Sequence, residues 1–185
     1  MKRLIGLLIV CLLVSGCSGK NEELDRAMAL RAKMLAHGVS FDAEITADYG
    51  DKTYTFAMNC QSDAQGNLKF TVSQPQSLAG ITGTVNANGG KLAFDSTALA
   101  FSLMADGQLS PVSAPWILVN TLRSGYLTSC GPEGKDIRLA IDDSYEEDAL
   151  HLDIWLGSED QPVRSEILWM GRRLLTINVT NFAFL

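Results

Sequence analysis

Residues Phe41 to Cys60 read FDAEITADYGDKTYTFAMNC, and this stretch decides the fold. Apolar and polar residues alternate on both sides of Gly50-Asp51, which is the period of a strand whose two faces differ. A Gly-Asp pair between two alternating runs favours a tight turn that joins antiparallel strands. We therefore predict an antiparallel hairpin with one apolar face and one polar face.

Short alternating runs continue on the C-terminal side of this hairpin as far as Leu103, separated by turns rich in Gly, Asn and Asp. The period becomes helical from Trp116 to about Gly125, a loop is expected at Gly131–Gly134, and alternation resumes at Ile137. On the N-terminal side, Glu22 to His37 has the spacing of an amphipathic helix. The predicted order is a helix, about six strands, a second helix and about four strands.

Nearly every predicted strand has one apolar and one polar face, so the sheet is expected to bury only one side. This pattern predicts an α+β fold: a strongly curved antiparallel sheet, a half-barrel of roughly ten strands, with helices packed on its concave face. No linker or change of composition divides residues 22–185. We expect these residues to form a single domain.

The first residues have the organisation of a secretion signal. A basic pair precedes the apolar run Leu4–Val14, which is short for a membrane span. Small residues then lead to Gly16 and Cys17, so we expect cleavage between these two and attachment of a diacylglycerol to the cysteine thiol. Residues 1–16 would be a lipoprotein signal peptide and residues 17–21 a tether. An uncleaved membrane helix with an incidental cysteine is the alternative.

The chain is acidic, with a formal charge of −6. Loss of Lys2 and Arg3 with the signal peptide would make this charge −8. Such a surface argues against nucleic-acid binding and against broad electrostatic docking on anionic lipid. We expect the lipid on Cys17 to hold the protein on the extracytoplasmic side of the cell membrane. An outer-membrane location is open if the host has two membranes.

Two cysteines remain after Cys11, which would leave with the signal, and Cys17 are set aside. Cys60 and Cys130 have no other cysteine or histidine at metal-binding spacing. In an oxidising compartment they could form one disulfide that closes a long loop. Two separate buried thiols are the alternative.

The sequence lacks the motifs that mark a catalytic or cofactor site. His37 and His151 do not have metal-ligand spacing, and no Gly-x-Ser-x-Gly elbow or phosphate-binding glycine loop is present. The acidic run Asp142–Asp148 lacks the central glycine of an EF-hand and indicates a solvated turn. We expect no metal, no cofactor and no enzymatic activity. A hydrolase would need a serine or aspartate within hydrogen-bond reach of His151 in a cleft.

The segment Gln74–Gly83, QPQSLAGITG, predicts a strand that ends in a proline-containing loop, and Gly90–Phe94, GKLAF, predicts a glycine-led hairpin. With the lipidation motif, the first helix and the interrupted meander, this order resembles the lipoprotein carrier and receptor family, LolA and LolB. The resemblance covers most of residues 22–185 and implies a half-barrel over helices that encloses an apolar cavity for acyl chains. The carrier's inward arginine has no counterpart here, and Leu109–Val112 matches the receptor's apolar loop only weakly.

Carried over to this chain, the resemblance implies a membrane-anchored, non-catalytic lipoprotein that binds a lipid, an acyl chain or another lipoprotein in the cavity. The alternative is a cell-envelope interaction or assembly lipoprotein with a solid core that docks a protein partner. Alternation alone does not separate cavity lining from packed core. The inward-pointing candidates for the cavity lining are Phe41, Tyr54, Phe56, Met58, Phe70, Phe94, Phe101, Leu152 and Ile154.

Overall fold

The computed structural model describes residues 21–94, 97–105 and 108–185. The predicted signal peptide, its cleavage site and Cys17 lie outside the described residues, as does all of the predicted tether except Asn21. Among the described helices, none combines the length and the apolar character needed to cross a membrane. Lipidation of Cys17 therefore stays a prediction.

The described chain contains two α-helices, one short 3-10 helix and thirteen strands. The helices are α2 (Glu22–Ala36), η1 (Pro111–Ser113) and α3 (Ala114–Ser124). The first strands are β1 (Val39–Asp48), β2 (Thr53–Ser62), β3 (Leu68–Gln74), β4 (Thr82–Asn86), β5 (Gly89–Phe94), β6 (Thr97–Phe101), β7 (Met104–Ala105) and β8 (Gln108–Leu109). The strands after α3 are β9 (Tyr126–Glu133), β10 (Asp136–Asp142), β11 (Leu150–Leu156), β12 (Pro162–Trp169) and β13 (Arg172–Phe184).

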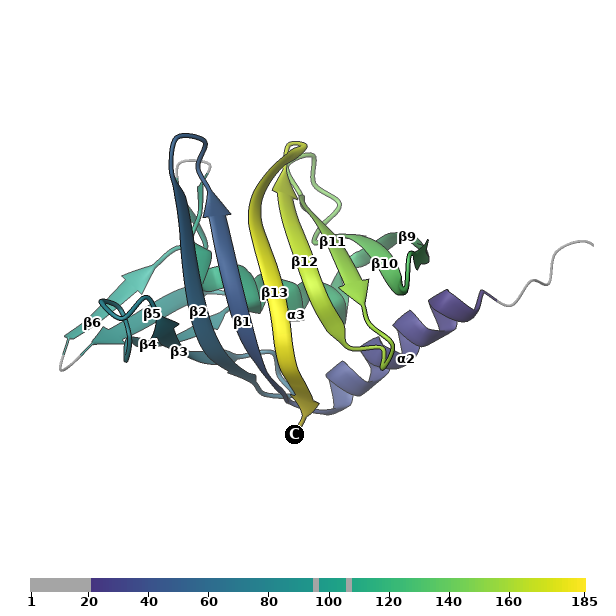
Figure 1. Ribbon diagram of the computed structural model, residues 1–185, viewed down its shortest axis with the longest axis horizontal. Coiled ribbons are helices and arrows are strands. Elements are labelled where there is room, and N and C mark those ends of the chain that lie inside the picture. The colour runs from purple at the N-terminus through teal and green to yellow at the C-terminus, as the bar shows by residue number, and fades with distance from the viewer. Residues whose placement is uncertain (1–20, 95–96, 106–107) are drawn as a thin grey trace, which may run out of the picture.

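Eleven of these strands form one open antiparallel sheet in the order β6-β5-β4-β3-β2-β1-β13-β12-β11-β10-β9 (Figure 1). The first strand, β1, pairs with the last, β13, and one meander runs outward from each of them. Strands β6 and β9 are the two edges, and β7 pairs with β8 in a separate ribbon. The prediction of an α+β fold with a long antiparallel sheet and two helices is confirmed, with eleven strands in place of about ten.

One face of the sheet is buried and the other is not. In β1, Phe41 and Ile45 are at most 3% exposed, whereas Asp42 and Glu44, which alternate with them, are more exposed. Helix α3 packs against β2, β10 and β13, so it spans both meanders, and eight of its eleven residues are buried. We call the side that carries Phe41 and Ile45 the helix face and the opposite side the polar face.

The two helices are tied to each other by arginine. The Asn21 side chain caps α2 by accepting a hydrogen bond from the Leu24 N–H at 3.0 Å. Arg31 of α2 donates to the carbonyl oxygens of Leu122 at 2.8 Å and Gly125 at 2.9 Å. These carbonyls stand at the end of α3, where no intrahelical donor remains for them. Partial burial lowers the pKa of the Arg31 guanidinium.

The disulfide considered for Cys60 and Cys130 is not formed, because both are free thiols. Cys60 lies in β2 and Cys130 in β9, and five strands stand between β2 and β9 in the sheet. Neighbouring strands are about 4.8 Å apart, and a disulfide needs Cα atoms within about 7 Å. Burial, with a smaller contribution from the charge of Asp42, raises the pKa of the Cys60 thiol and keeps it protonated.

The acidic run Asp142–Asp148 connects β10 to β11 at the surface, where Tyr145 is 81% exposed. Asp143 is partly buried there, and its Oδ1 accepts a hydrogen bond from the Leu150 N–H at 2.8 Å. Burial raises the pKa of the Asp143 carboxyl, although the hydrogen bond from Leu150 opposes this. In the part of the chain that the structure describes, no three His, Cys, Asp or Glu side chains are placed to hold a metal ion.

Replacing Asp143 by asparagine is expected to stabilise the protein at pH 7. The amide oxygen would still accept from the Leu150 N–H, and no charge would have to be buried. Because folding raises the pKa of the Asp143 carboxyl, its contribution to stability falls as the pH rises through that value. The gain from Asp143→Asn should therefore disappear below the unfolded-state pKa of about 3.9. Urea unfolding at pH 7 and pH 3 measures this, and an unchanged gain at both pH values would contradict it.

Candidate functional site

The nine predicted cavity-lining residues divide into two groups by burial. One group is packed in the core and at most 3% exposed: Phe41, Met58, Phe70, Leu152 and Ile154. The other group opens toward the surface: Tyr54 at 44% exposed, Phe94 at 54%, and the partly buried Phe56 and Phe101. Both candidates on β11 belong to the packed group. Every candidate of the more exposed group lies on β2, β5 or β6.

The helix face is uncovered next to the open edge β6. Leu99 is 64% exposed and Phe94 is 54% exposed, while Leu92, the cross-strand partner of Leu99, is partly buried. These side chains share a face with the core because Phe70, Gly83, Leu92 and Leu99 are successive cross-strand partners. Ile81 and Phe101 extend the same surface. We call this surface the apolar strip, and it consists of Ile81, Leu92, Phe94, Leu99 and Phe101.

Two glycines allow aromatic rings to lie across neighbouring strands at this end of the sheet. Gly83 in β4 is paired with Phe70, and a Cβ atom at Gly83 would overlap the Phe70 ring. Gly90 in β5 is paired with Phe101, and a Cβ atom there would overlap the Phe101 ring. The absence of a side chain at both positions lets each ring cover the adjacent main chain.

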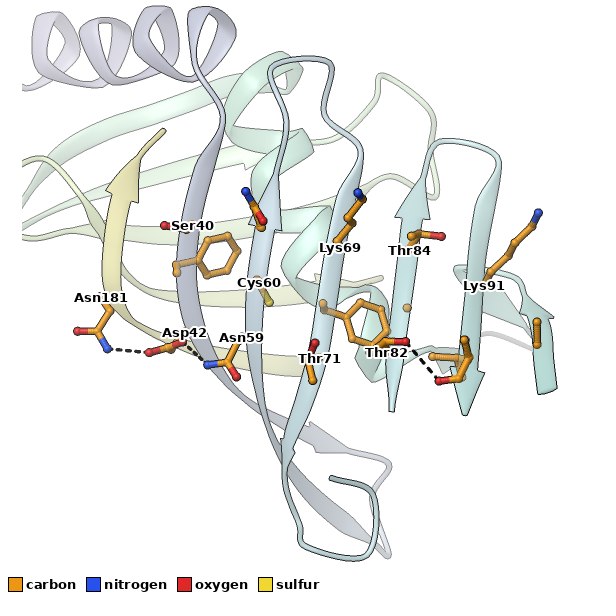
Figure 2. A pocket seen from close by; sticks show the side chains of 17 residues that line it. Ser40, Asp42, Asn59, Cys60, Lys69, Thr71, Thr82, Thr84, Lys91 and Asn181 are labelled. Atoms are coloured by element: carbon orange, nitrogen blue, oxygen red, sulfur yellow. Dashed lines mark hydrogen bonds between the residues drawn. The ribbon is translucent and has the colours of Figure 1, made fainter. Parts of the chain in front are cut away.

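The polar face carries a groove of about 790 Å³ that runs across the strands (Figure 2). Each wall of the groove is a line of side chains from residues that are cross-strand partners on neighbouring strands. The side chains of the residues between the two walls point to the helix face. Main chain therefore forms the floor of what we call the cross-strand groove. The first wall consists of Ser40, Gln61, Lys69, Thr84 and Lys91. The second wall consists of Asp42, Asn59, Thr71, Thr82 and Ala93.

The two walls differ in charge. On the second wall, the Asp42 carboxylate accepts hydrogen bonds from Asn59 at 2.6 Å and from Asn181 of β13 at 2.7 Å (Figure 2). On the first wall, Lys69 and Lys91 are exposed, and within the described residues neither takes part in an ion pair. The first wall is therefore cationic, and the carboxylate of the second wall is held by amides.

No protein-family model matches the sequence, and no curated protein matches it significantly. Among solved structures, a putative outer membrane lipoprotein-sorting protein domain from Vibrio parahaemolyticus aligns with a TM-score of 0.48 at 11% identity, over 88% of this chain and 92% of that one. A LolA superfamily protein from Nitrosomonas europaea gives 0.44 at 9% identity, over 84% and 92%. The Mycobacterium tuberculosis lipoprotein LppX gives 0.42 at 12% identity, over 87% and 93%.

The structural neighbours include proteins named for the LolA superfamily, for outer membrane lipoprotein sorting and as a lipoprotein. The family that the order of elements resembles is thus among these neighbours, at 9% to 12% sequence identity. What these proteins bind is a property of those proteins, so we derive the function of this chain from its own residues.

His151 of β11 lies between two carboxylates. Its Nδ1 is 2.7 Å from Asp142 Oδ1, and its Nε2 is 3.5 Å from Asp153 Oδ1. Asp153 also accepts a hydrogen bond from Arg138 Nε at 3.0 Å. An aspartate is thus within reach of His151, but no described serine, threonine or cysteine hydrogen-bonds to it. The cluster lies on β10 and β11, away from the cross-strand groove.

Several residues of both surfaces were not singled out from the sequence. Leu92, Leu99 and Ile81 belong to the apolar strip but are not among the nine predicted cavity-lining residues. Lys69 and Lys91 are likewise not among the residues that the sequence pattern predicts for a site. A usable signal exists for the lysines, because they are the only charged residues between Ala64 and Phe94 in an acidic chain.

Proposed function

We propose that the protein is a non-catalytic lipoprotein, anchored through Cys17, that binds the acyl chain of a lipid or of another lipoprotein on the apolar strip. In this proposal the sheet is curved, and the strip lies at the open end of its concave face. The observation that carries the proposal is the exposure of Phe94 and Leu99 beside a packed core. Single exposed apolar residues are common, but a contiguous apolar surface marks a binding site.

The cover provided by α3 explains why the strip is open. Leu152 and Ile154 on β11 are completely buried, whereas Leu99 on the edge strand β6 is 64% exposed. A bound alkyl chain would cover the strip and recover about 25 cal/mol for each Å² of apolar area removed from water. Part of this gain is offset by the cost of association.

The chemistry of the strip favours an alkyl chain. On β4, β5 and β6, the residues that point to the helix face include no charged residue, and Thr97 is the polar one among them. An alkyl chain needs only apolar contact, whereas a folded protein partner usually needs polar anchors at the rim of its interface. Because Cys17 precedes the α2 cap Asn21 by four residues, the predicted lipid would keep the domain within about 15 Å of the membrane surface.

Strand β6 supports a second candidate function. It is an edge strand, and its sequence Thr97–Phe101, TALAF, contains neither a charge nor a proline. Charged residues and prolines are the usual means of preventing unwanted pairing at a sheet edge. An extended segment of a protein partner could therefore add to the sheet at β6. This corresponds to the interaction or assembly lipoprotein considered from the sequence.

Titration of the purified full chain with fluorescent palmitate tests the lipid-binding proposal. The double substitution Phe94→Ser with Leu99→Ser is expected to weaken binding at least tenfold. Leu35→Ser on α2 is the matched control, because Leu35 is 53% exposed and lies outside the strip. The proposal fails if the wild type does not bind palmitate, or if the double variant binds as well as the control.

A substitution that places a charge on the edge strand β6 distinguishes the two candidate functions experimentally. Ala98 of β6 points to the polar face, so Ala98→Lys should hinder strand addition and leave the apolar strip intact. Unchanged palmitate binding by this variant supports the lipid-binding proposal. A stoichiometric protein partner that Ala98→Lys abolishes, in a chain that does not bind palmitate, would select the second candidate.

A further inference from the structure

We propose that the cross-strand groove is a second binding site, which takes the phosphate group of a polyol phosphate ester between Lys69 and Lys91. The site lies on the polar face, on the opposite side of the sheet from the apolar strip. The polar side chains that carry it, Lys69, Lys91 and Thr84, do not belong to the apolar strip, and the proposal does not depend on lipid binding at the strip.

The positions of the two lysines suit one shared anion. Lys69 of β3 is the cross-strand partner of Thr84 of β4, which is in turn the partner of Lys91 of β5. The two lysines therefore stand two strand spacings apart, about 9.6 Å along the sheet. Figure 2 shows both side chains on the same side of the groove with Thr84 between them. Two long, flexible ammonium side chains can converge on one phosphate above the Thr84 hydroxyl.

The distribution of charge points to an anionic ligand. Lys69 and Lys91 are the only charged residues between Ala64 and Phe94, while the whole chain carries a formal charge of −6. In the described structure, no ion pair involves either lysine. Asp42, on the opposite wall, accepts hydrogen bonds from two asparagines. The cationic wall is thus left without a carboxylate of its own and is complementary to a phosphate.

The size and the second wall of the groove indicate what the phosphate is attached to. A volume of about 790 Å³ lies in the range of small-molecule sites and exceeds the space that a phosphate fills. Thr71 and Thr82 line the second wall, and their hydroxyl groups can both donate and accept hydrogen bonds. They suit the hydroxyl groups of a glycerol or a sugar. The ligand class is therefore a polyol phosphate, either free or as the headgroup of a lipid.

Isothermal titration of the full chain distinguishes these two sources. Glycerol 1-phosphate is the free probe, and monomeric dihexanoyl-phosphatidylglycerol is the headgroup probe. We expect the wild type to bind at least one of them, and glycerol without a phosphate not to bind. Binding of both probes identifies a site open to the free ester, and binding of the lipid probe alone identifies a headgroup site. Binding of neither probe would overturn the proposal.

Two double variants that remove the same number of charges test whether the phosphate probe binds in the cross-strand groove. The substitutions Lys69→Gln with Lys91→Gln should weaken binding of the phosphate probe at least tenfold. Lys52→Gln with Lys135→Gln removes the same charge from two exposed turn lysines and should leave the affinity unchanged. Equal affinities of the two double variants would refute the site. If Phe94→Ser with Leu99→Ser abolishes binding of the lipid probe while Lys69→Gln with Lys91→Gln does not, the lipid is held by the strip and the groove proposal fails.

Discussion

Replacing Gly83 by alanine is expected to lower the free energy of unfolding by about 2 kcal/mol. A Cβ atom at Gly83 would overlap the ring of Phe70 and would lie 2.8 Å from the Lys91 carbonyl oxygen. Phe70 is 3% exposed, so its ring has little space to move into, and the carbonyl belongs to the paired strand. The new methyl group can therefore be accommodated only by strain in the sheet.

Gly131→Ala is the matched control for this substitution. Gly131 also lies in a strand, β9, but no heavy atom stands within 4 Å of the position its Cβ would take. Alanine there should be neutral or slightly stabilising, because it reduces the freedom of the unfolded chain. Phe70→Leu should reduce the additional cost of Gly83→Ala in a double-mutant cycle. Equal effects of Gly83→Ala and Gly131→Ala in urea unfolding would show that the ring does not lie over Gly83.

Ile154→Ala is expected to cost about 2–5 kcal/mol of stability. Ile154 is completely buried in the core, so the substitution leaves a cavity that its neighbours fill only in part. Phe94→Ala removes a larger side chain that is 54% exposed, and it should cost clearly less than Ile154→Ala. Chemical denaturation of the two variants in parallel measures the difference.

The comparison between these two variants also tests where a ligand can bind. If Ile154 lined a hollow, its truncation would cost little stability and would change palmitate binding. A loss of stability at Ile154 with unchanged binding, and a loss of binding at Phe94 with little loss of stability, is the expected pattern. The opposite pattern would move the binding site from the apolar strip to the region beneath β11.

The alternation in the sequence predicted most strands and both helices because burial on one face imposes it directly. The helix expected at Glu22–His37 is observed at Glu22–Ala36. The loop expected at Gly131–Gly134 was wrong, since β9 continues through Pro132 to Glu133. Pro132 interrupts the apolar pattern but is tolerated because β9 is an edge strand, where one side of the main chain needs no partner.

The candidate sites were predicted less well, for a geometric reason. Alternation shows which face a residue takes, but not how much of that face α3 covers. The eleven residues of α3 span about 16 Å, whereas an eleven-stranded sheet extends over roughly 48 Å between its edge strands. Leu152 and Phe94 therefore occupy equivalent positions in the alternating pattern, but Leu152 is buried and Phe94 is exposed in the structure. The cross-strand groove depends on the register between strands, which no local pattern reveals.

The pairing of β1 with β13 places the first and last strands of the domain side by side in the middle of the sheet. In the export that the proposed signal peptide would direct, the chain would emerge from the translocation channel beginning at its N-terminus. Each meander could then assemble from its own hairpins, but the seam between them would close only after residues up to Phe184 had crossed the membrane. Such contacts between distant parts of a chain form slowly. A chain exported in this way would therefore expose β1 as a temporary edge until β13 pairs with it.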